Sequence, residues 1–130
     1  MSDAFRTAGR GLPAALAKAG GLDAGAPPLL AVEHLTVGFD IDRRLVPAVI
    51  GVTFNMRAGE TLCLVGESGS GKTLTALSII RLLPGSARVT SGSVRLNHRD
   101  LLTLAEREME RVRGGEIGFV FQEPSAALNP

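Results

Sequence analysis

The chain contains a single cysteine, Cys63, and has neither tryptophan nor tyrosine. One cysteine excludes an internal disulfide and a metal site made of cysteines alone. Because five phenylalanines are the only aromatic residues, we do not expect a surface that stacks nucleic-acid bases on several rings. A net charge of +1 gives no general attraction to nucleic acid or anionic lipid. No apolar run approaches the roughly 20 residues that a membrane-spanning helix needs.

What is present indicates a globular α/β chain preceded by a leader. Of the 130 residues, 45% are hydrophobic and 16 are glycine. Residues 1–28 consist mostly of Ala, Gly and Pro, and we expect them to form a flexible leader. Charged residues interrupt every apolar run there, which excludes a signal peptide, while an organellar transit peptide is a weaker alternative. Residues 29–130 form the second unit.

The second unit alternates between strand and helix patterns. Apolar alternation and β-branched residues predict strands at 29–37, 46–54, 61–65, 93–96 and 117–121. The third of these is continuously apolar, as in a strand buried on both faces of a parallel sheet. The spacing predicts a buried helix over 73–83 and a charged surface helix over 101–113. The predicted fold class is therefore α/β.

The sharpest motif is Gly-Glu-Ser-Gly-Ser-Gly-Lys-Thr at 66–73, which fits G-x-x-x-x-G-K-[ST] between a strand and a helix. Glycines let the backbone curl so that successive N–H groups face one phosphate, and the helix adds its positive end. Lys72 supplies a mobile charge for the β- and γ-phosphates, and the Thr73 hydroxyl is a ligand for Mg²⁺. A plain glycine-rich turn with an exposed lysine is the alternative. The predicted nucleotide-binding residues of this loop are Gly66, Ser68, Gly69, Ser70, Gly71, Lys72, Thr73 and Leu74.

Around this motif the chain resembles a particular family. Residues 65–73 look like the Walker A region of ABC transporter ATPase subunits, and Phe-Val-Phe-Gln-Glu-Pro at 119–124 looks like their Q-loop. The continuation at 125–130 is similar to the dipeptide, oligopeptide and nickel importer branch, although Ala126-Ala127 departs from its usual polar pair. The resemblance covers about residues 30–130 and leaves the leader unmatched.

The resemblance implies a P-loop NTPase of the ABC ATPase type, comprising the N-terminal β-subdomain and the start of the ATP-binding core. It implies ATP and Mg²⁺ as cofactors. Gln122 would contact Mg²⁺ and the attacking water, Thr73 would hold Mg²⁺, and Lys72 would stabilise transition-state charge. Phe39 matches the aromatic residue that stacks on adenine, where the family often has Tyr. An ordinary core residue is the alternative for Phe39.

For the whole protein, the resemblance implies an ATPase subunit that couples ATP binding and hydrolysis to import of peptides or a similar solute. Its partners would be transmembrane permease subunits and a second ATPase subunit, in a homodimer or heterodimer, and nucleic acid is not expected. The subunit would lie peripherally on the cytoplasmic face of the cell membrane, with indirect membrane contact. The alternatives are a soluble ABC-type ATPase of DNA repair or translation, and a non-catalytic truncated remnant.

Several family motifs are not found in these 130 residues: the signature motif, the Walker B aspartate and the catalytic glutamate. We therefore expect the ATP-binding domain to be truncated just after the Q-loop and this chain alone to be inactive as an ATPase. Simpler interpretations hold for other residues. The Glu67 side chain should point away from the phosphates, His34 and His98 are isolated, and Cys63 should be a buried, inert residue.

Overall fold

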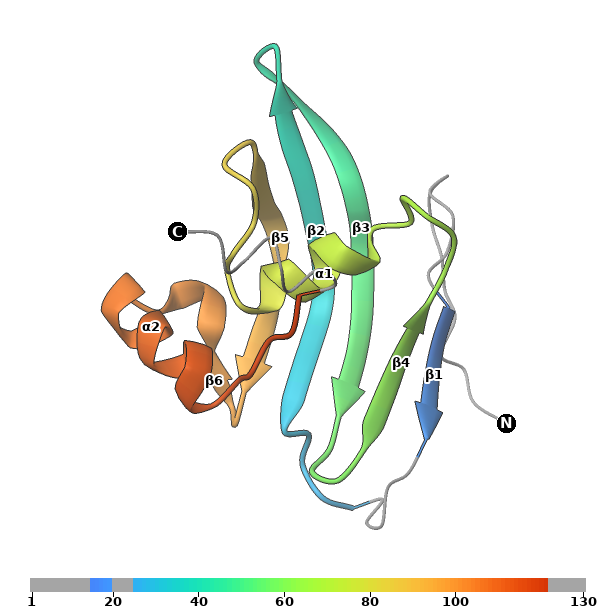
Figure 1. Cartoon of the computed structure of the whole chain (residues 1–130), viewed down its shortest axis with the longest axis vertical. Coiled ribbons are helices and arrows are strands. Elements are labelled where there is room, and N and C mark those ends of the chain that lie inside the picture. Colours follow the sequence, from blue (N-terminus) through green and yellow to red (C-terminus); the bar gives the residue numbers. More distant parts are fainter. Residues whose placement is uncertain (1–14, 20–24, 122–130) are drawn as a thin grey trace.

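The computed structural model describes residues 15–19 and 25–121, and its main feature is a four-stranded antiparallel sheet (Figure 1). The strand order is β3–β2–β5–β6. These strands are β2 (Leu30–Ile41), β3 (Arg44–Met56), β5 (Ala87–Leu96) and β6 (Arg99–Asp100). The strands predicted at 29–37 and 46–54 correspond to β2 and β3, which form one hairpin. The strand predicted at 93–96 is the second half of the longer β5, and β6 was not predicted.

The β2–β3 hairpin sets the register of the sheet. Its two turn residues, Asp42 and Arg43, have positive φ values of 50° and 63°, as a tight two-residue hairpin turn requires. From this turn, Ile41 pairs with Arg44, Phe39 with Val46 and Val37 with Val49. The hairpin extends beyond the rest of the sheet (Figure 1).

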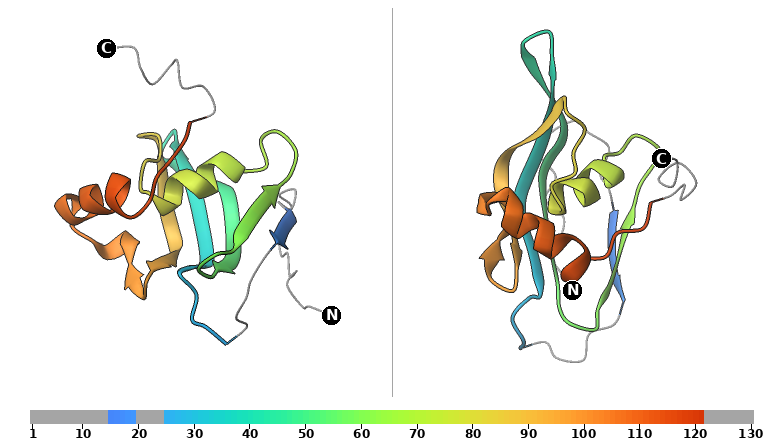
Figure 2. Two further views of the ribbon diagram at one scale, coloured as in Figure 1. Left: turned by 60° about the horizontal axis from the view of Figure 1, so that its bottom comes forward. Right: turned by 60° about the vertical axis from the view of Figure 1, so that its left-hand side comes forward.

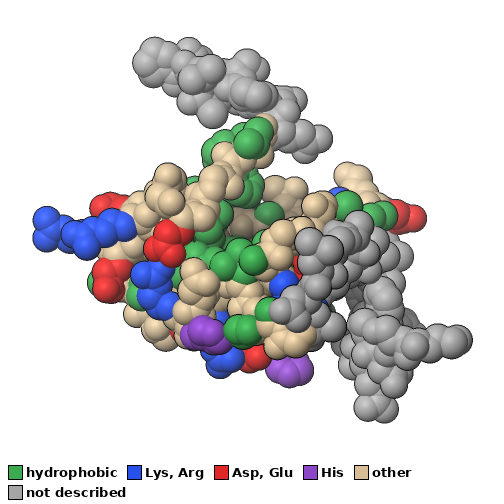
Figure 3. Space-filling view, turned by 90° about the horizontal axis from the view of Figure 1, so that it is seen from below, with side chains coloured by type: hydrophobic (Ala, Val, Ile, Leu, Met, Phe, Trp, Pro, Cys, Tyr) green, Lys and Arg blue, Asp and Glu red, His purple; other side chains and the backbone are tan. Residues whose placement is uncertain are grey.

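The hydrophobic core lies between one face of this sheet and the two helices. The first helix, α1 (Lys72–Ile79), crosses that face, and α2 (Glu106–Gly115) follows a short 3₁₀ turn, η1 (Leu101–Thr103) (Figure 2). Fully buried side chains come from the sheet, from η1 and from α2, and include Val32, Leu35, Val37, Val94, Leu101, Met109 and Val112. Seen from below, hydrophobic side chains gather in the middle and charged ones lie toward the rim (Figure 3). The apolar residues that recur along the strands and helices thus pack together on one face of the sheet.

Strand β4 (Thr61–Val65) differs from its prediction. It pairs antiparallel with β1 (Ala15–Ala19), and among the described residues it has no parallel neighbour. Its side chains alternate between exposed and half-buried, so the expectation of a strand buried on both faces is wrong here, and Cys63 is exposed. The physical reason is that no described element covers both faces of β4. The pairing also gives residues 15–19, within the expected leader, a strand conformation, because it satisfies backbone groups along one edge of β4.

Two further elements end where the backbone becomes left-handed. The predicted helix over 73–83 stops at Ile79, because Arg81 has φ 54°. Helical geometry in α2 breaks at Arg113 and at Gly114, which has φ 86°. The predicted strand over 117–121 is not formed, and only an isolated bridge joins Ile117 to Arg113. In the described part of the chain, no helix is long and apolar enough to cross a membrane.

Candidate functional site

The predicted phosphate loop connects β4 to α1, as the motif requires. Gly69 and Gly71 have φ values of 80° and 86°, a left-handed conformation that glycine adopts without steric cost. The amide of Ser70 donates to the carbonyl oxygen of Glu67 over 3.2 Å, which closes a turn inside the loop. The loop therefore has the curled backbone that the glycine spacing predicts.

Gly71 anchors the end of the loop against the sheet. A Cβ atom at this position would lie 2.8 Å from Cγ2 of Val49 and 3.3 Å from the carbonyl oxygen of Ala48, both on β3. A Cβ built on Gly69 would meet nothing within 4 Å. The two glycines thus have different roles. Gly71 permits close packing on β3, and Gly69 leaves open space where a ligand can approach the backbone.

The ammonium group of Lys72 is wrapped by the loop. Its Nζ donates to the carbonyl oxygen of Gly66 at 2.7 Å, to that of Glu67 at 2.6 Å and to Oγ of Ser70 at 3.1 Å. An ammonium group has three N–H donors, and these three oxygens accept all of them. A phosphate that binds Lys72 must replace at least one of these partners, and the longest contact, to Ser70, is the easiest to exchange.

The first turn of α1 completes an anion-binding arrangement. No side chain caps this end of the helix, and its first turn contains no acidic residue. The amides of a first helical turn have no partner within the helix, so they are donors for an anion. The first intrahelical bond runs from the amide of Thr75 to the carbonyl of Gly71 at 2.8 Å. The amides before Thr75 thus have no carbonyl partner within the helix.

The loop residues differ in which of their groups are accessible to a nucleotide. Ser68 and Thr73 are exposed, so their hydroxyls are accessible, and Thr73 fits a role as a Mg²⁺ ligand through its hydroxyl oxygen. Leu74 packs its side chain against the core, so only its backbone can face a ligand. Thr75 is buried and its hydroxyl donates to the Gly71 carbonyl over 2.9 Å, so it braces the helix start. Among the described residues, no cluster of His, Cys, Asp and Glu forms a separate metal site.

Phe39 lies on β2, on the same sheet face as Val37 and therefore on the face that α1 covers. Its ring is half-buried, and its cross-strand partners are Val46 on β3 and Ala87 on β5. Val46 is 45% exposed, which leaves an apolar surface beside the phenylalanine ring. Sequence reasoning missed Val46, although counting the register back from the Asp42–Arg43 turn would have paired it with Phe39.

Gln122, the remaining predicted site residue, lies outside the described residues. The same holds for residues 123–130, whose sequence resembles that of the peptide importer branch. The segment just before it is described. Phe119 packs against the core, and its ring meets that of Phe121 edge-on, with 4.9 Å between centroids. Val120 and Phe121 are exposed. The contact between Gln122 and the loop therefore stays a prediction.

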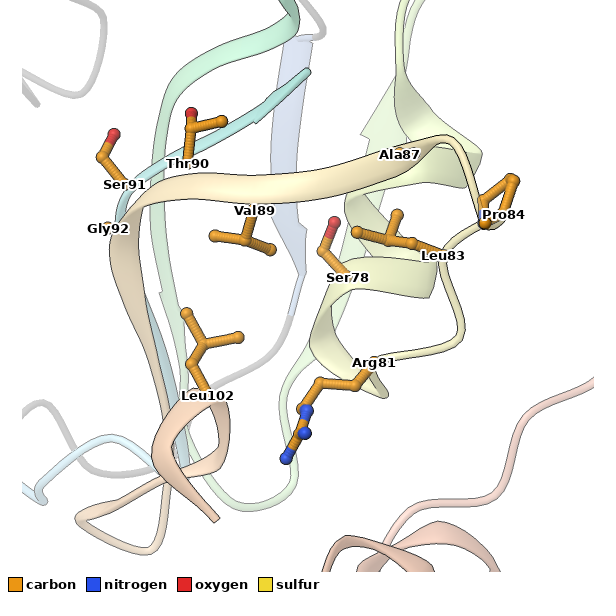
Figure 4. Close-up of a pocket in the computed structure, with 11 residues that line it drawn as sticks. Ser78, Arg81, Leu83, Pro84, Ala87, Val89, Thr90, Ser91, Gly92 and Leu102 are labelled. Atoms are coloured by element: carbon orange, nitrogen blue, oxygen red, sulfur yellow. The ribbon is translucent and has the colours of Figure 1, made fainter. Parts of the chain in front are cut away.

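A cavity of about 500 Å³ lies near the opposite end of α1 from the phosphate loop. Figure 4 shows the side chains of Ser78, Leu83, Val89 and Leu102 around it. None of the predicted nucleotide-binding residues lines this cavity. The site identified by the motif is thus separate from this cavity.

A strand, a glycine loop wrapped around a lysine, and an uncapped helix together define a P-loop NTPase. Comparison with known proteins extends this assignment. The family described as ABC transporter matches residues 49–130, which is more than half of the chain and includes the whole loop. The chain belongs to the ABC transporter family.

Three of the similar proteins come from bacteria. Over 103 residues, the chain is 48% identical to the uncharacterized ABC transporter ATP-binding protein YejF of Escherichia coli, covering 78% of this chain and 20% of that protein. It is 46% identical over 103 residues to the dipeptide transport ATP-binding protein DppD of Bacillus subtilis, covering 78% and 31% respectively. The oligopeptide transport ATP-binding protein OppD of Mycobacterium tuberculosis is 48% identical over 103 residues, covering 79% and 17%. The chain thus spans a third or less of the length of these relatives.

Proposed function

We propose that this chain binds Mg-ATP through residues 66–74 and forms the phosphate-loop part of an ABC transporter ATPase subunit. The observation that carries the proposal is the position of the Lys72 ammonium, which the loop holds beside the uncapped start of α1. Lys72 is the first residue of α1, whose first-turn amides have no carbonyl partner within the helix, and the open space at Gly69 lets a ligand approach the loop backbone.

In this proposal each residue has a distinct role. Backbone amides of the loop and of the first turn of α1 bind the phosphate oxygens, and Lys72 stabilises the charge of the β- and γ-phosphates. Thr73 would hold Mg²⁺, which supplies charge neutralisation to the phosphates when it is bound. Phe39 stacks on the adenine, with Val46 as its exposed neighbour. Gln122 would help to hold Mg²⁺ and would orient the attacking water.

The relatives named for dipeptide and oligopeptide transport support a transport role for the whole protein. In that role ATP binding and hydrolysis are coupled to import of peptides or a similar solute. The proposed partners are transmembrane permease subunits and a second ATPase subunit. The proposed location is the cytoplasmic face of the cell membrane, with membrane contact made through the permease.

For the 130-residue chain, we propose nucleotide binding without turnover. Hydrolysis by the family needs a base, and the sequence contains no apolar run that ends in Asp-Glu. Lys72 and Gln122 stabilise charge and position water, but neither accepts the proton from water. Mg-dependent ATPase activity from this chain that disappears with Lys72→Ala would contradict this part of the proposal.

The binding test is a titration of the chain with a fluorescent ATP analogue, with and without Mg²⁺. Lys72→Ala should weaken binding by roughly ten- to a hundredfold, because a charge-assisted hydrogen bond contributes about 1.5–3 kcal/mol. Arg107→Ala is the matched control, because it removes one exposed cation from α2 and changes the net charge equally. Equal affinity of the two variants would overturn the proposed site.

A further inference from the structure

The end of α1 contains an arginine where a glycine is usual. The amide of Leu82 donates to the carbonyl of Leu77 at 2.9 Å, and that of Arg81 to the carbonyl of Ser78 at 3.2 Å. This pair of bonds is the Schellman motif, whose left-handed residue is here Arg81, with φ 54°. A side chain in this conformation costs about 1–2 kcal/mol relative to glycine. An observed strained residue of this kind calls for a compensating contact.

The guanidinium of Arg81 supplies that contact by reaching the segment before α2. Its Nη1 donates to the carbonyl oxygen of Leu104 at 2.6 Å and to that of Leu101 at 3.4 Å. Its Nη2 lies 3.4 Å from Oε2 of Glu106, in the first turn of α2. Figure 4 shows the Arg81 side chain extending away from Ser78 and Leu83, out of the end of α1. One side chain therefore joins the C-terminal end of α1 to η1 and to α2.

Glu106 extends this connection to the other end of α2. Its Oε1 accepts a hydrogen bond from Arg113, at the position where helical geometry breaks. Beyond Arg113 the chain turns back, with the amide of Gly114 donating to the Ile117 carbonyl at 2.9 Å. A third ion pair, between Arg99 and Glu116 at 2.5 Å, holds the same turn to β6. This turn leads along the chain to Phe119–Phe121, the residues that precede Gln122 in the sequence.

The exposures of the three side chains argue against a purely stabilising role. The side chains of Arg81 and Arg113 are 27% and 18% exposed, but that of Glu106 is 60% exposed. Because Glu106 is exposed, its two ion pairs contribute little to stability, and the strain at Arg81 is offset by the hydrogen bonds to the carbonyls of Leu101 and Leu104. The arrangement instead fixes the position of the segment 101–106 relative to the end of α1, because one planar guanidinium binds three oxygens of that segment at once.

We infer that Arg81 is a positioning residue that links the phosphate-loop helix to the segment preceding Gln122 through Glu106 and Arg113. Lys72 and Thr73 lie at one end of α1 and Arg81 follows the other. A nucleotide-dependent shift of α1 would therefore be passed to η1 and α2, and through the turn at Gly114 to residues 119–121. This inference rests on the proposed binding of Mg-ATP at the loop.

The variant Arg81→Gly separates this role from a structural one. Glycine suits the left-handed position, so the helix end is kept and its strain is relieved, while the guanidinium is removed. Arg81→Lys keeps the charge but cannot bind two carbonyls and a carboxylate in one plane. Arg95→Met is the matched control, since it breaks the 3.0 Å pair with Glu33 on the sheet face turned away from α1.

The experiment is amide hydrogen exchange of the full 130-residue chain, with and without Mg-ATP. In the unaltered chain and in Arg95→Met, nucleotide should slow exchange in residues 66–74 and also, by roughly fivefold, in residues 106–121. In Arg81→Gly and Arg81→Lys, protection should persist at 66–74 and be lost at 106–121.

Each other outcome has a definite meaning. Nucleotide protection at 106–121 that survives Arg81→Gly would overturn the inference, as would its absence from the unaltered chain that binds Mg-ATP. No protection at 66–74 and no titration signal would instead refute the proposed nucleotide site, and the inference would be refuted with it. Recovery of the long-range protection by Arg81→Lys would show that charge alone suffices and would refute the three-oxygen geometry.

Discussion

Strands β2 and β4 lie in the same chain and are both largely apolar, yet their surroundings differ. β2 has hydrogen-bonded neighbours on both sides, and Val32, Leu35 and Val37 on its core face are fully buried. β4 pairs only with β1 among the described strands, and its residues alternate between exposed and half-buried. The phosphate loop begins on β4 and ends against β3, so the candidate site lies at the boundary between these two regions.

This difference separates the source of stability from the source of binding chemistry. The four-stranded sheet and its helices contain the buried core, whereas the residues of the loop at 66–73 are exposed or half-buried. At Gly71 the loop packs tightly against β3. A variant in the sheet should therefore alter folding, a variant in the exposed loop should alter binding, and a variant at Gly71 should alter both.

The largest expected effect is on the stability side of the comparison. Leu35→Ala removes a fully buried side chain and leaves a cavity, so the free energy of unfolding should fall by about 2–5 kcal/mol. Leu64→Ala on β4 removes a half-buried side chain of the same size and should cost only about 1 kcal/mol. Urea denaturation followed by circular dichroism measures both. Equal losses would show that β4 is as well covered as β2.

The second prediction concerns the boundary itself. Residue 71 has a left-handed backbone, and the Cβ of Gly71→Ala would lie 2.8 Å from Cγ2 of Val49. The substitution should therefore destabilise the chain by about 2–3 kcal/mol and displace the loop. Gly69→Ala has a similar φ but open space, and should cost about 1 kcal/mol. Thermal denaturation with nucleotide titration distinguishes the two. A Gly71→Ala chain as stable as Gly69→Ala would mean that the contact with β3 does not position the loop.

How much could be predicted from the sequence also differs between these regions. Local patterns were sufficient for the loop, because its glycines, Lys72 and the following helix act over eight consecutive residues. They were also sufficient for β2 and β3, whose alternation and turn residues are adjacent in the chain. The antiparallel pairing and exposure of β4 could not be predicted, because burial of a strand depends on which distant segments cover it.

The end of α1 could not be predicted from the sequence for a related reason. A pattern of apolar residues continues to Leu83, yet α1 stops at Ile79 because Arg81 adopts a left-handed conformation. Arginine gives no sequence signal for such a position, which glycine usually occupies. The contacts that hold it come from Leu101, Leu104 and Glu106, twenty or more residues away. Phe39 could be selected from the sequence, whereas its neighbour Val46 emerged only from the strand register.

The third prediction uses Phe39 to ask whether the sheet contributes to binding. If its ring stacks on adenine, Phe39→Ala should weaken ATP binding by about 1–2 kcal/mol, or roughly five- to thirtyfold, and leave inorganic triphosphate binding unchanged. Phe39→Tyr keeps the ring and should bind like the unaltered chain. Competition titrations with ATP and triphosphate measure this. Equal weakening for both ligands would instead indicate that Phe39 is a core residue.

The smallest effect should come from the outer surface of the sheet, where neither stability nor binding is concentrated. Arg95 pairs with Glu33 at 3.0 Å across β5 and β2, and both side chains are nearly half exposed. Because water screens such a pair, Arg95→Met should change the free energy of unfolding by less than about 1 kcal/mol, and less still in high salt. Nucleotide affinity should not change, since Val94 beside it faces the core and Arg95 therefore faces away from α1. A loss as large as that of Leu35→Ala would mean that the outer face of the sheet, too, carries part of the stability that we assign to its core.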